Sequence, residues 1–463
     1  MISARAIKEM ISMIIKNRTE LLSHGNKRGR EAILEVLKCA INVVDIYEAT
    51  KKSVFIKNND LHIKDLNYDL SKIENIYVIG GGKATFSAAK ALDEVLGERI
   101  KRGCINIKGN MRKRLKQIKV IEAGHPIPNE RGYEGAREIM DIAKEAKKSD
   151  LVFCVITGGA SALMPLPAEN IALEDKKKVT DQLLKCGATI SEINTVRKHI
   201  SRVKGGRLAE IAYPSRVISL ILSDVIGDRL DIIASGPTSP DNTTYQDALR
   251  VLVQYKLIDT SPRSVVGVLE RGIKGLLPET PKGGSPIFEK ANNIIIGSNK
   301  KALAGAKTEA EKLLHVEILS SEITGEARDV GKWLAQKAKE IKSSRSSNRP
   351  LCLISGGETT VTVKGNGIGG RNMELALSFA MEIEGIEGIT LLSAGTDGTD
   401  GPTDAAGAIV DGQTEVKARA TGVSPEEYLR NNDSYNFFKK IDGLFITGPT
   451  GTNVMDVQIV VIE

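Results

Sequence analysis

The sequence predicts an α/β protein with two domains, and three observations support this prediction. At 463 residues the chain is longer than one hydrophobic core usually serves. Apolar runs of strand length alternate with segments of helical spacing, which is typical of mainly parallel sheets covered by helices on both faces. Many of the 44 glycines directly follow these apolar runs, where loops that bind ligands usually lie.

The apolar segments fall into two series, separated by a stretch rich in proline and glycine. The first series comprises residues 76–80, 119–123, 151–157 and 217–223. The second comprises residues 292–298, 316–321, 350–355, 388–395, 444–448 and 457–463, and helical patterns intervene, as at 132–148 and 299–314. Because residues 275–290 are the best candidate linker, we expect domains at 1–280 and 281–463, the first beginning with a helical extension at 1–27.

The composition excludes several classes of protein. With 41% hydrophobic and 27% charged residues, the chain is typical of soluble globular proteins. Its five cysteines and five histidines are scattered without C-x-x-C or H-E-x-x-H motifs, which argues against a disulfide framework and against a transition-metal site. No apolar run is long enough to cross a membrane, and Lys8 and Glu9 interrupt any signal peptide, so we expect a cytoplasmic protein. Abundant lysine, glutamate and isoleucine hint at a thermophile.

Two features bear on macromolecular partners. The net charge is +7, but the densest basic stretch, residues 108–119, has no interleaved aromatic residues, so we expect no nucleic acid partner. At the N-terminus, Ile7, Ile11, Ile14 and Ile15 recur at helical spacing and predict an amphipathic helix that packs on the body of the protein or on a second subunit. A homodimer is therefore left open.

The sequence IYVIGGGKATFSAA, residues 76–89, combines a strand, three glycines, Lys83 and a helical pattern. Glycines free the backbone to approach a ligand, and the amide groups of a following helix attract anions. The stretch fits neither the P-loop motif nor the dinucleotide fingerprint, because Ala84 follows the lysine and Thr85 replaces the third glycine. It indicates a phosphate site of another kind, with Gly81 and Gly82 in the binding loop.

Two further strands run into similar turns, at residues 152–163 and 351–361. The ligands of open α/β sheets gather at the carboxyl ends of strands, so the three turns are expected to meet at one cleft. Each turn alone would be an ordinary turn, but together they favour anion binding.

Two acidic loops follow apolar strands. In 217–241, Asp224 ends a strand and is well placed to hold Mg²⁺ or to accept a hydroxyl proton, whereas Asp228 and Asp231 are expected to form turns. In 391–410, the spacing does not match a calcium loop. Asp397 with a bound nucleotide would suffice for Mg²⁺.

Two basic segments supply candidate ligands for anions. Arg371 opens a predicted helix after a glycine-rich loop, where a guanidinium can clamp phosphate or carboxylate; the alternative is a surface salt bridge. The segment 193–210 carries Arg197, Lys198, Arg202, Lys204 and Arg207. These residues point in different directions on a helix, so at most two of them are expected to contact substrate.

These motifs resemble those of the glycerate 2-kinase family, two-domain glycerate kinases whose C-terminal half is called the MOFRL domain. In the first half the resemblance is carried by GGGKAT (80–85), EAGHPIPNERG (122–132), TGGASAL (157–163), GATISEINTVRKHISRVKGGRLA (187–209) and LSDVIGDRLDIIASGPTSPD (222–241). In the second half it is carried by SGGETTVTVKGNGIGGRNMELAL (355–377), AGTDGTDGPTDAAGAIVD (394–411) and TGPTGTNVMD (447–456). It covers roughly residues 28–463.

The resemblance implies phosphorylation of D-glycerate by ATP with Mg²⁺, usually giving 2-phosphoglycerate. It also implies a Rossmann-like N-terminal domain, a smaller α/β C-terminal domain and an active cleft between them. Lys83 and Arg371 then stabilise the transferring phosphoryl group, and Asp224 and Asp397 lie in motifs that resemble metal or substrate-orienting sites. Glycerate is assigned to Gly158, Gly159 and Ser161 with Arg197 and Lys204. The nucleotide is assigned to Gly81 and Gly82 and to Ser355, Gly356, Gly357 and Glu358. Which glycine turn binds the nucleotide and which binds glycerate is left open at this point.

Three alternatives remain open at this point. A hydroxypyruvate reductase would need a nicotinamide site, and no G-x-G-x-x-G motif followed by an acidic residue is present. A catalytically silent anion-binding module is discouraged by the presence of Lys83, Asp224, Arg371 and Asp397 together. The third alternative is a glycerate kinase that gives 3-phosphoglycerate, because both hydroxyl groups lie within a small rotation of the same bound molecule.

Overall fold

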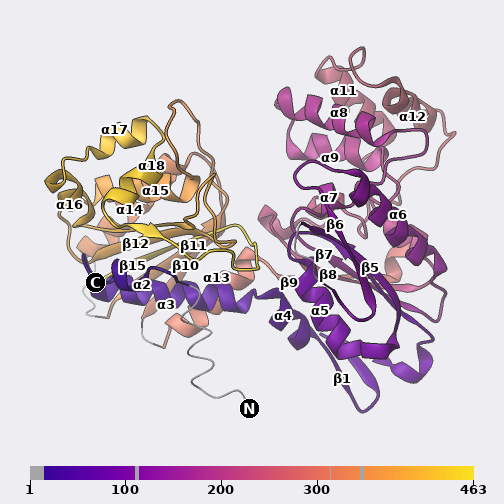
Figure 1. Ribbon diagram of the computed structural model, residues 1–463, viewed down its shortest axis with the longest axis horizontal. Coiled ribbons are helices and arrows are strands. Elements are labelled where there is room, and N and C mark those ends of the chain that lie inside the picture. The colour runs from indigo at the N-terminus through magenta and orange to yellow at the C-terminus, as the bar shows by residue number, and fades with distance from the viewer. Residues whose placement is uncertain (1–14, 110–113, 313, 345–348) are drawn as a thin grey trace. The chain divides into compact units, whose positions relative to one another are not determined.

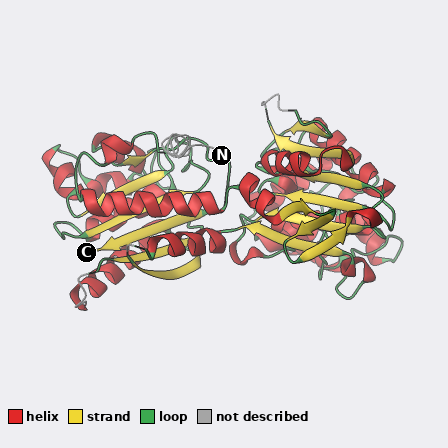
Figure 2. Cartoon of the chain, turned by 90° about the horizontal axis from the view of Figure 1, so that it is seen from below, coloured by secondary structure: helices red, strands yellow, loops and turns green. Residues whose placement is uncertain are grey.

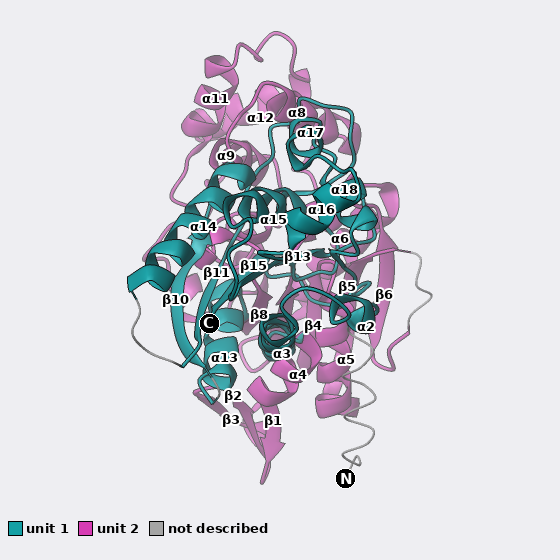
Figure 3. Cartoon of the chain, turned by 90° about the vertical axis from the view of Figure 1, so that its left-hand side faces the viewer, with its two compact units in different colours: residues 1–45, 297–463 teal, residues 46–296 magenta. Residues whose placement is uncertain are grey.

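A computed structural model of the chain describes residues 15–109, 114–312, 314–344 and 349–463. The chain divides into two compact units, which Figure 3 shows in different colours. Unit 1 comprises Met1–Asp45 and Gly297–Glu463, and unit 2 comprises Ile46–Ile296. The expected N-terminal helix through Ile7, Ile11 and Ile14 lies outside the described residues.

Unit 2 is built on a six-stranded sheet with the order β6-β5-β4-β7-β8-β9. The strands are β4 (Ile76–Gly81), β5 (Ile100–Lys108), β6 (Ile118–Ala123), β7 (Leu151–Ile156), β8 (Arg216–Leu222) and β9 (Ala291–Gly297). The first five of these strands pair in parallel. Numbered along the chain, the order is 3-2-1-4-5-6, the Rossmann order, so the prediction of a mainly parallel Rossmann-like sheet is confirmed.

Helices cover this sheet as the apolar sequence of its strands requires. The strands β4 and β7 are buried along their whole length. Tyr77, Ile79 and Cys154 form a core with Ile139 and Met140 of α6 (Glu130–Glu145). The connection that contains α5 (Thr85–Leu96) runs from β4 to β5 in one direction across the sheet, and the connection that contains α6 runs from β6 to β7 in the other. Because both crossovers are right-handed, α5 covers the face opposite to α6.

A second set of helices in unit 2 forms a separate helical group at one end of the sheet, labelled in the upper right of Figure 1. They share an apolar core that includes Val179, Val196, Leu252 and Leu269. The group comprises α8 (Leu173–Lys185), α9 (Ile190–His199), α11 (Tyr245–Gln254) and α12 (Arg263–Ile273). Unit 2 also contains α4 (Ile46–Ser53), the antiparallel strands β1 (Val54–Lys57), β2 (Asp60–Ile63) and β3 (Leu66–Asp69), and the short helices α7 (Ala160–Leu163) and α10 (Arg207–Ala212).

Unit 1 has a six-stranded mixed sheet with the order β10-β11-β15-β12-β13-β14. The strands are β10 (His315–Ile323), β11 (Leu351–Gly357), β12 (Ile389–Gly395), β13 (Gly407–Asp411), β14 (Leu444–Phe445) and β15 (Asp456–Ile462). Among the described strands of this sheet, β10 and β11 pair in parallel and the other pairings are antiparallel. The expectation of mainly parallel sheets is therefore wrong for this unit, because apolar runs reveal burial on both faces but not strand direction.

Helices lie on both faces of the unit 1 sheet, and strands and helices are coloured separately in Figure 2. One face packs against α14 (Ala327–Ser344) and α15 (Arg371–Glu382). The strands β10, β11, β12 and β15 also contact α3 (Lys27–Val43) and α13 (Asn299–Ala310). The unit further contains α2 (Arg18–Leu21), α16 (Thr414–Ala420), α17 (Pro425–Arg430) and α18 (Ser434–Lys440). No helix among the described residues is long and apolar enough to cross a membrane.

The division into units differs from the expected domains at both ends. The expected boundary at 280 falls in the loop before β9, which completes the sheet of unit 2. Residues 15–45 belong to unit 1, where the buried Arg30 of α3 pairs with the buried Asp411 at 2.7 Å. A contact between residues so far apart in the chain leaves no signal in a local sequence pattern.

Candidate active site

Two of the glycine turns meet at the centre of the unit 2 sheet. They follow β4 and β7, the neighbouring strands between which the strand order reverses, where open α/β sheets bind their ligands. The N–H of Lys83 donates to the carbonyl of Gly158 at 2.8 Å, and the N–H of Ala84 donates to Thr157 Oγ1 at 3.1 Å. The structure thus joins two of the three predicted turns; the third follows β11 in unit 1.

The glycines after β4 are required by close packing. A Cβ on Gly82, whose φ is +143°, would lie 2.1 Å from Thr157 Oγ1. A Cβ on Gly81 would lie 2.9 Å from Met164 Cγ. The packing of the two turns accounts for both glycines, and their contact with a nucleotide stays a prediction.

The side chain of Lys83 lies beside Gly159 and His125. Gly159 has a φ of +83°, and a Cβ there would lie 2.8 Å from His125 Nε2 and 3.2 Å from Lys83 Cγ. Burial, reinforced by the charges of Lys83 and Lys108, lowers the pKa of His125 to about 4. The imidazole is therefore neutral near pH 7, and its buried Nδ1 has no hydrogen-bond partner among the described residues. The sequence analysis missed His125, although it follows β6, whose carboxyl end lies at this same edge.

Asp224 follows β8 and reaches the same turn. A Cβ on Gly158 would lie 2.2 Å from Asp224 Oδ2, so the carboxylate lies directly against this glycine. Asp231 instead accepts from the Arg229 guanidinium at 2.8 Å. The carboxyl edge of the unit 2 sheet therefore places a lysine, a neutral histidine and a carboxylate around the turn at 158–159.

A cavity of about 450 Å³ lies beside this turn and is lined by two of the predicted substrate ligands, Ser161 and Arg197. Ser161 Oγ shares a hydrogen bond with Ser235 Oγ at 2.9 Å, and Ser235 donates to Asn194 Oδ1 at 2.9 Å. Lys204 Nζ donates to the carbonyl of Ala234, the residue before Ser235, at 3.4 Å. The structure thus brings together Ser161, Arg197 and Lys204.

The lining of the cavity includes a buried cation that the sequence analysis missed. Lys176 of α8 lines the cavity, is 5% exposed, and lies within a run of three lysines. Burial first, and the charge of Arg197 second, lower its pKa to about 7. Burial also lowers the pKa of Lys204 well below its usual value, and the charges of Lys176 and Arg197 add to this effect.

The other cations of the 193–210 segment have partners of their own. Lys198 pairs with Asp241 at 3.2 Å, and Arg207 donates to the carbonyl of Pro278 at 3.0 Å. Arg202 lies 3.8 Å from Glu169.

In unit 1, Arg371 is held at the start of α15 by two carboxylates. Its Nε and Nη2 donate to Asp456 at 2.6 and 3.0 Å, and its Nη1 donates to Glu358 at 2.7 Å. These contacts raise the pKa of Arg371 against the effect of its own burial, whereas burial raises the pKa of Asp456. The guanidinium charge is thus balanced within the unit, and a phosphate that binds Arg371 must compete with these carboxylates.

Asp397 and Asp400 play different parts in their loop. Asp397 Oδ1 accepts from the N–H and the hydroxyl of Thr399 at 3.1 and 3.0 Å. Asp400 accepts from the N–H groups of Asn372 and Met373 and so caps α15; burial raises its pKa to about 7. Its role as a helix cap was missed in the sequence analysis.

The carboxylates of unit 1 offer oxygen ligands of the kind that Mg²⁺ takes. A Cβ on Gly395 would lie 3.4 Å from Asp397 Oδ1 and 3.7 Å from Asp456 Oδ1, so both carboxylates border this glycine. No group of three or more potential metal ligands occurs within the described residues. One or two carboxylates with phosphate oxygens fit Mg²⁺, so the residues present are compatible with a nucleotide-borne ion.

The turn after β11 is largely internal to unit 1. Ser355 Oγ donates to Gln458 Oε1 at 3.1 Å inside the sheet. A Cβ on Gly356 would lie 2.1 Å from Asn299 Oδ1, and one on Gly357, with φ +148°, would lie 2.1 Å from the carbonyl of Ile323. Packing accounts for these three residues, which leaves Glu358 as the predicted nucleotide ligand with a side chain outside the sheet.

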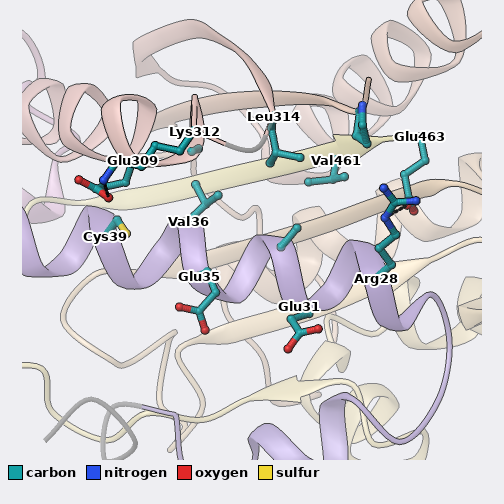
Figure 4. A pocket seen from close by; sticks show the side chains of 13 residues that line it. Arg28, Glu31, Glu35, Val36, Cys39, Glu309, Lys312, Leu314, Val461 and Glu463 are labelled. Atoms are coloured by element: carbon teal, nitrogen blue, oxygen red, sulfur yellow. Dashed lines mark hydrogen bonds and ion pairs between the residues drawn. The ribbon is translucent and has the colours of Figure 1, made fainter. Parts of the chain in front are cut away.

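A second cavity, of about 780 Å³, lies in unit 1 between α3, the end of α13 and the end of β15 (Figure 4). It is bordered by Arg28, Glu35, Lys312 and Glu463 around apolar Val36. Leu351 and Ile462 are paired at this end of the sheet, whereas Gly357 and Asp456 are paired at the other. Seven-residue strands at about 3.3 Å per residue therefore separate it from Arg371 by roughly 20 Å, and it belongs to no predicted site.

Comparisons with known proteins agree over nearly the whole chain. Two sequence families match, a domain of unknown function (DUF4147) at residues 32–270 and the MOFRL family at residues 351–456. The D-glycerate 2-kinase of Thermotoga maritima is 47% identical over 415 residues, which are 89% of this chain and 96% of that protein. The glycerate 2-kinase of Pyrococcus horikoshii is 43% identical over 94% of this chain and 97% of that protein. The crystal structure of the T. maritima glycerate kinase matches with a TM-score of 0.83 at 44% identity, covering 94% of this chain and 99% of that one.

Proposed function

Because this chain belongs to the glycerate 2-kinase family, a family of phosphotransferases that act on an alcohol group, we propose that it transfers the γ-phosphoryl group of ATP to D-glycerate. We propose Mg²⁺ as the accompanying ion and 2-phosphoglycerate as the product. The observation that carries the proposal is the arrangement of Lys83, His125 and Asp224 around the turn at 158–159, next to the cavity that contains Ser161 and Arg197.

This arrangement supplies what phosphoryl transfer needs from a protein. The transferring group carries negative charge on its oxygens, so positioned cations and amide groups matter more than covalent chemistry. Lys83 extends from the carboxyl edge of the sheet, and a glycine turn there lets a ligand approach the backbone closely. Lys83 is therefore assigned to the transferring phosphoryl group.

Asp224 is the proposed acceptor of the proton that the attacking hydroxyl of glycerate releases. Its carboxylate lies against Gly158, at the same edge as Lys83. Neutral His125 lies at the same turn and carries no proton on one of its ring nitrogens. That nitrogen can accept a hydrogen bond from a hydroxyl group of glycerate and so orient the substrate. The substrate itself is assigned to Gly158, Gly159 and Ser161, with Arg197 and Lys204.

In unit 1, Arg371 is assigned to the phosphates of the nucleotide, together with Glu358. Mg²⁺ would supply positive charge that neutralises the phosphates; Asp397 is the metal ligand proposed in unit 1, and Asp224 is the one proposed in unit 2. Asp456 holds the guanidinium of Arg371 by two parallel hydrogen bonds and thereby fixes its direction. A homodimer stays a prediction.

The deciding experiment incubates the full chain with ATP, Mg²⁺ and D-glycerate and identifies the phosphorylated carbon by NMR. Formation of 2-phosphoglycerate supports the proposal, and formation of 3-phosphoglycerate overturns its regiochemistry alone. A parallel assay with hydroxypyruvate and NADH tests the reductase alternative, which the kinase relatives do not favour. Oxidation of NADH without kinase activity would overturn the proposal.

A further inference from the structure

Lys176 and Arg197 line the cavity beside Ser161, and the charges of both act on the buried Lys204; none of the three has an acidic partner among the described residues. Lys176 Nζ is buried and has no hydrogen-bond partner among the described residues. Lys204, 1% exposed, reaches only a backbone carbonyl, and Arg197 forms no ion pair within the described part of the chain. Among the described residues, no acidic group acts on the pKa of any of the three, whereas Arg197 lowers the pKa of Lys176 and both lower the pKa of Lys204. Uncompensated buried charge is costly, so an anion that enters the cavity would stabilise the charged form of this cluster.

Two other buried cations of this chain, which have a structural role, each pair with a carboxylate. Lys198, on the same helix as Arg197, is 3% exposed and pairs with Asp241. Arg30 is 2% exposed and pairs with Asp411. The cluster at the cavity differs from both of these in lacking a carboxylate, which indicates that its partner comes from outside the protein.

The acidic residues at the rim of the cavity do not fill this role. Glu174 and Asp181 line the cavity but are exposed, and each pairs with another lysine, Lys177 and Lys185 respectively, at 2.7 Å. The remaining lining is largely apolar, with Pro126, Ile127 and Leu173 among its members. A small anion that enters this space therefore meets cations in the lining and little competition from the protein's own acids.

We infer that Lys176, together with Arg197 and Lys204, binds the carboxylate of the phosphate acceptor, and that Lys176 restricts the enzyme to acceptors that carry one. The inference rests on the proposed function for the identity of the acceptor. It adds a residue to the site and a reason for selectivity. When the carboxylate of a three-carbon acid binds these cations, its hydroxyl groups lie towards Ser161 and the turn at 158–159. Lys83 and Asp224 lie at this same turn. An alcohol such as glycerol offers the same hydroxyl groups and no charge to balance the cations.

Binding is measured first without nucleotide, as the shift in melting temperature caused by D-glycerate and, at the same concentration, by glycerol. The wild-type protein is expected to be stabilised by glycerate and not by glycerol. The variant Lys176→Met, which keeps an unbranched side chain one atom shorter and removes its charge, is expected to lose the response to glycerate. The control is Lys185→Met on the same helix, an exposed lysine outside the cavity lining, which is expected to respond like the wild type.

Steady-state kinetics provide the second measurement. Lys176→Met is expected to raise the KM for D-glycerate at least tenfold and to leave the KM for ATP unchanged, because the carboxylate and not the phosphate contacts this lysine. An unchanged KM for glycerate, or an increase confined to ATP, overturns the inference. Lys204→Met gives the same test from a second position. If the wild type binds glycerate but does not phosphorylate it, the proposed function fails, and the thermal shifts still decide the carboxylate site.

Discussion

Replacing Lys176 by methionine is expected to stabilise the free protein, and to do so most at low pH. The pKa of Lys176 is about 7 in the folded chain and 10.5 for an ordinary lysine. Because the folded value is the lower one, the unfolded chain binds more protons between these two values, and wild-type stability rises with pH in this window. Above pH 10.5 the lysine is neutral in both the folded and the unfolded chain and costs no stability. As the pH falls from 10.5 towards 7, the wild type loses stability, because only the unfolded chain binds the proton readily.

The size of the effect follows from the two pKa values. At pH 7 the lysine costs about 4 kcal/mol of unfolding free energy relative to a neutral side chain, and at pH 9 about 2 kcal/mol. The advantage of Lys176→Met over the wild type is therefore expected to shrink by about 2 kcal/mol between pH 7 and pH 9. These values are upper bounds, since relaxation of the structure around the charge reduces them.

The assay is urea denaturation of the wild type and of Lys176→Met at both pH values, in the absence of carboxylate buffers. Lys185→Met serves as the control, because an exposed, paired lysine contributes little at either pH. A variant that is less stable than the wild type, or a stability difference that does not change with pH, would refute the idea that Lys176 is an uncompensated buried cation.

Two further predictions concern residues that the structure places in pairs. Lys198→Met is expected to lower the free energy of unfolding by about 3–5 kcal/mol, because the buried carboxylate of Asp241 loses its lysine partner; denaturation measures this, and a stability equal to that of the wild type would contradict it. Arg371→Lys is expected to lower kcat about 10²-fold although the charge is kept, because an ammonium group cannot reproduce the two parallel hydrogen bonds to Asp456. Steady-state kinetics measure this loss, and far-UV circular dichroism checks that the fold is retained. A loss in kcat of less than threefold would contradict the prediction.

Much of the fold was predictable because long apolar runs mark buried strands. The runs at 76–80 and 151–157 became β4 and β7, and the glycine turns after them meet as expected. The strand β5 (Ile100–Lys108) was missed, since Lys101, Arg102 and Gly103 interrupt its apolar pattern. Strand direction in unit 1 and the packing of α3 there depend on contacts between distant segments, which no local pattern records.

The candidate site shows the same limit at the level of single side chains. Lys83 and Asp224 stood out because each directly follows an apolar strand. Lys176 did not, because it lies in a run of three lysines on α8, and such runs usually form a solvated face. Only the packing of α8 in the helical group of unit 2 buries one of the three and leaves its neighbours at the surface. His125 was likewise a lone histidine until the neighbouring turn placed it beside Lys83.

The most direct test of the account is the turnover of Lys83→Ala with ATP, Mg²⁺ and D-glycerate, measured beside the wild type. A cation at a transferring phosphoryl group can be worth about 10³-fold or more in kcat. We therefore predict a loss of about that size, with an unchanged melting temperature and circular dichroism spectrum. A kcat within a few-fold of the wild type would contradict the assignment of the carboxyl edge of the unit 2 sheet as the site of phosphoryl transfer.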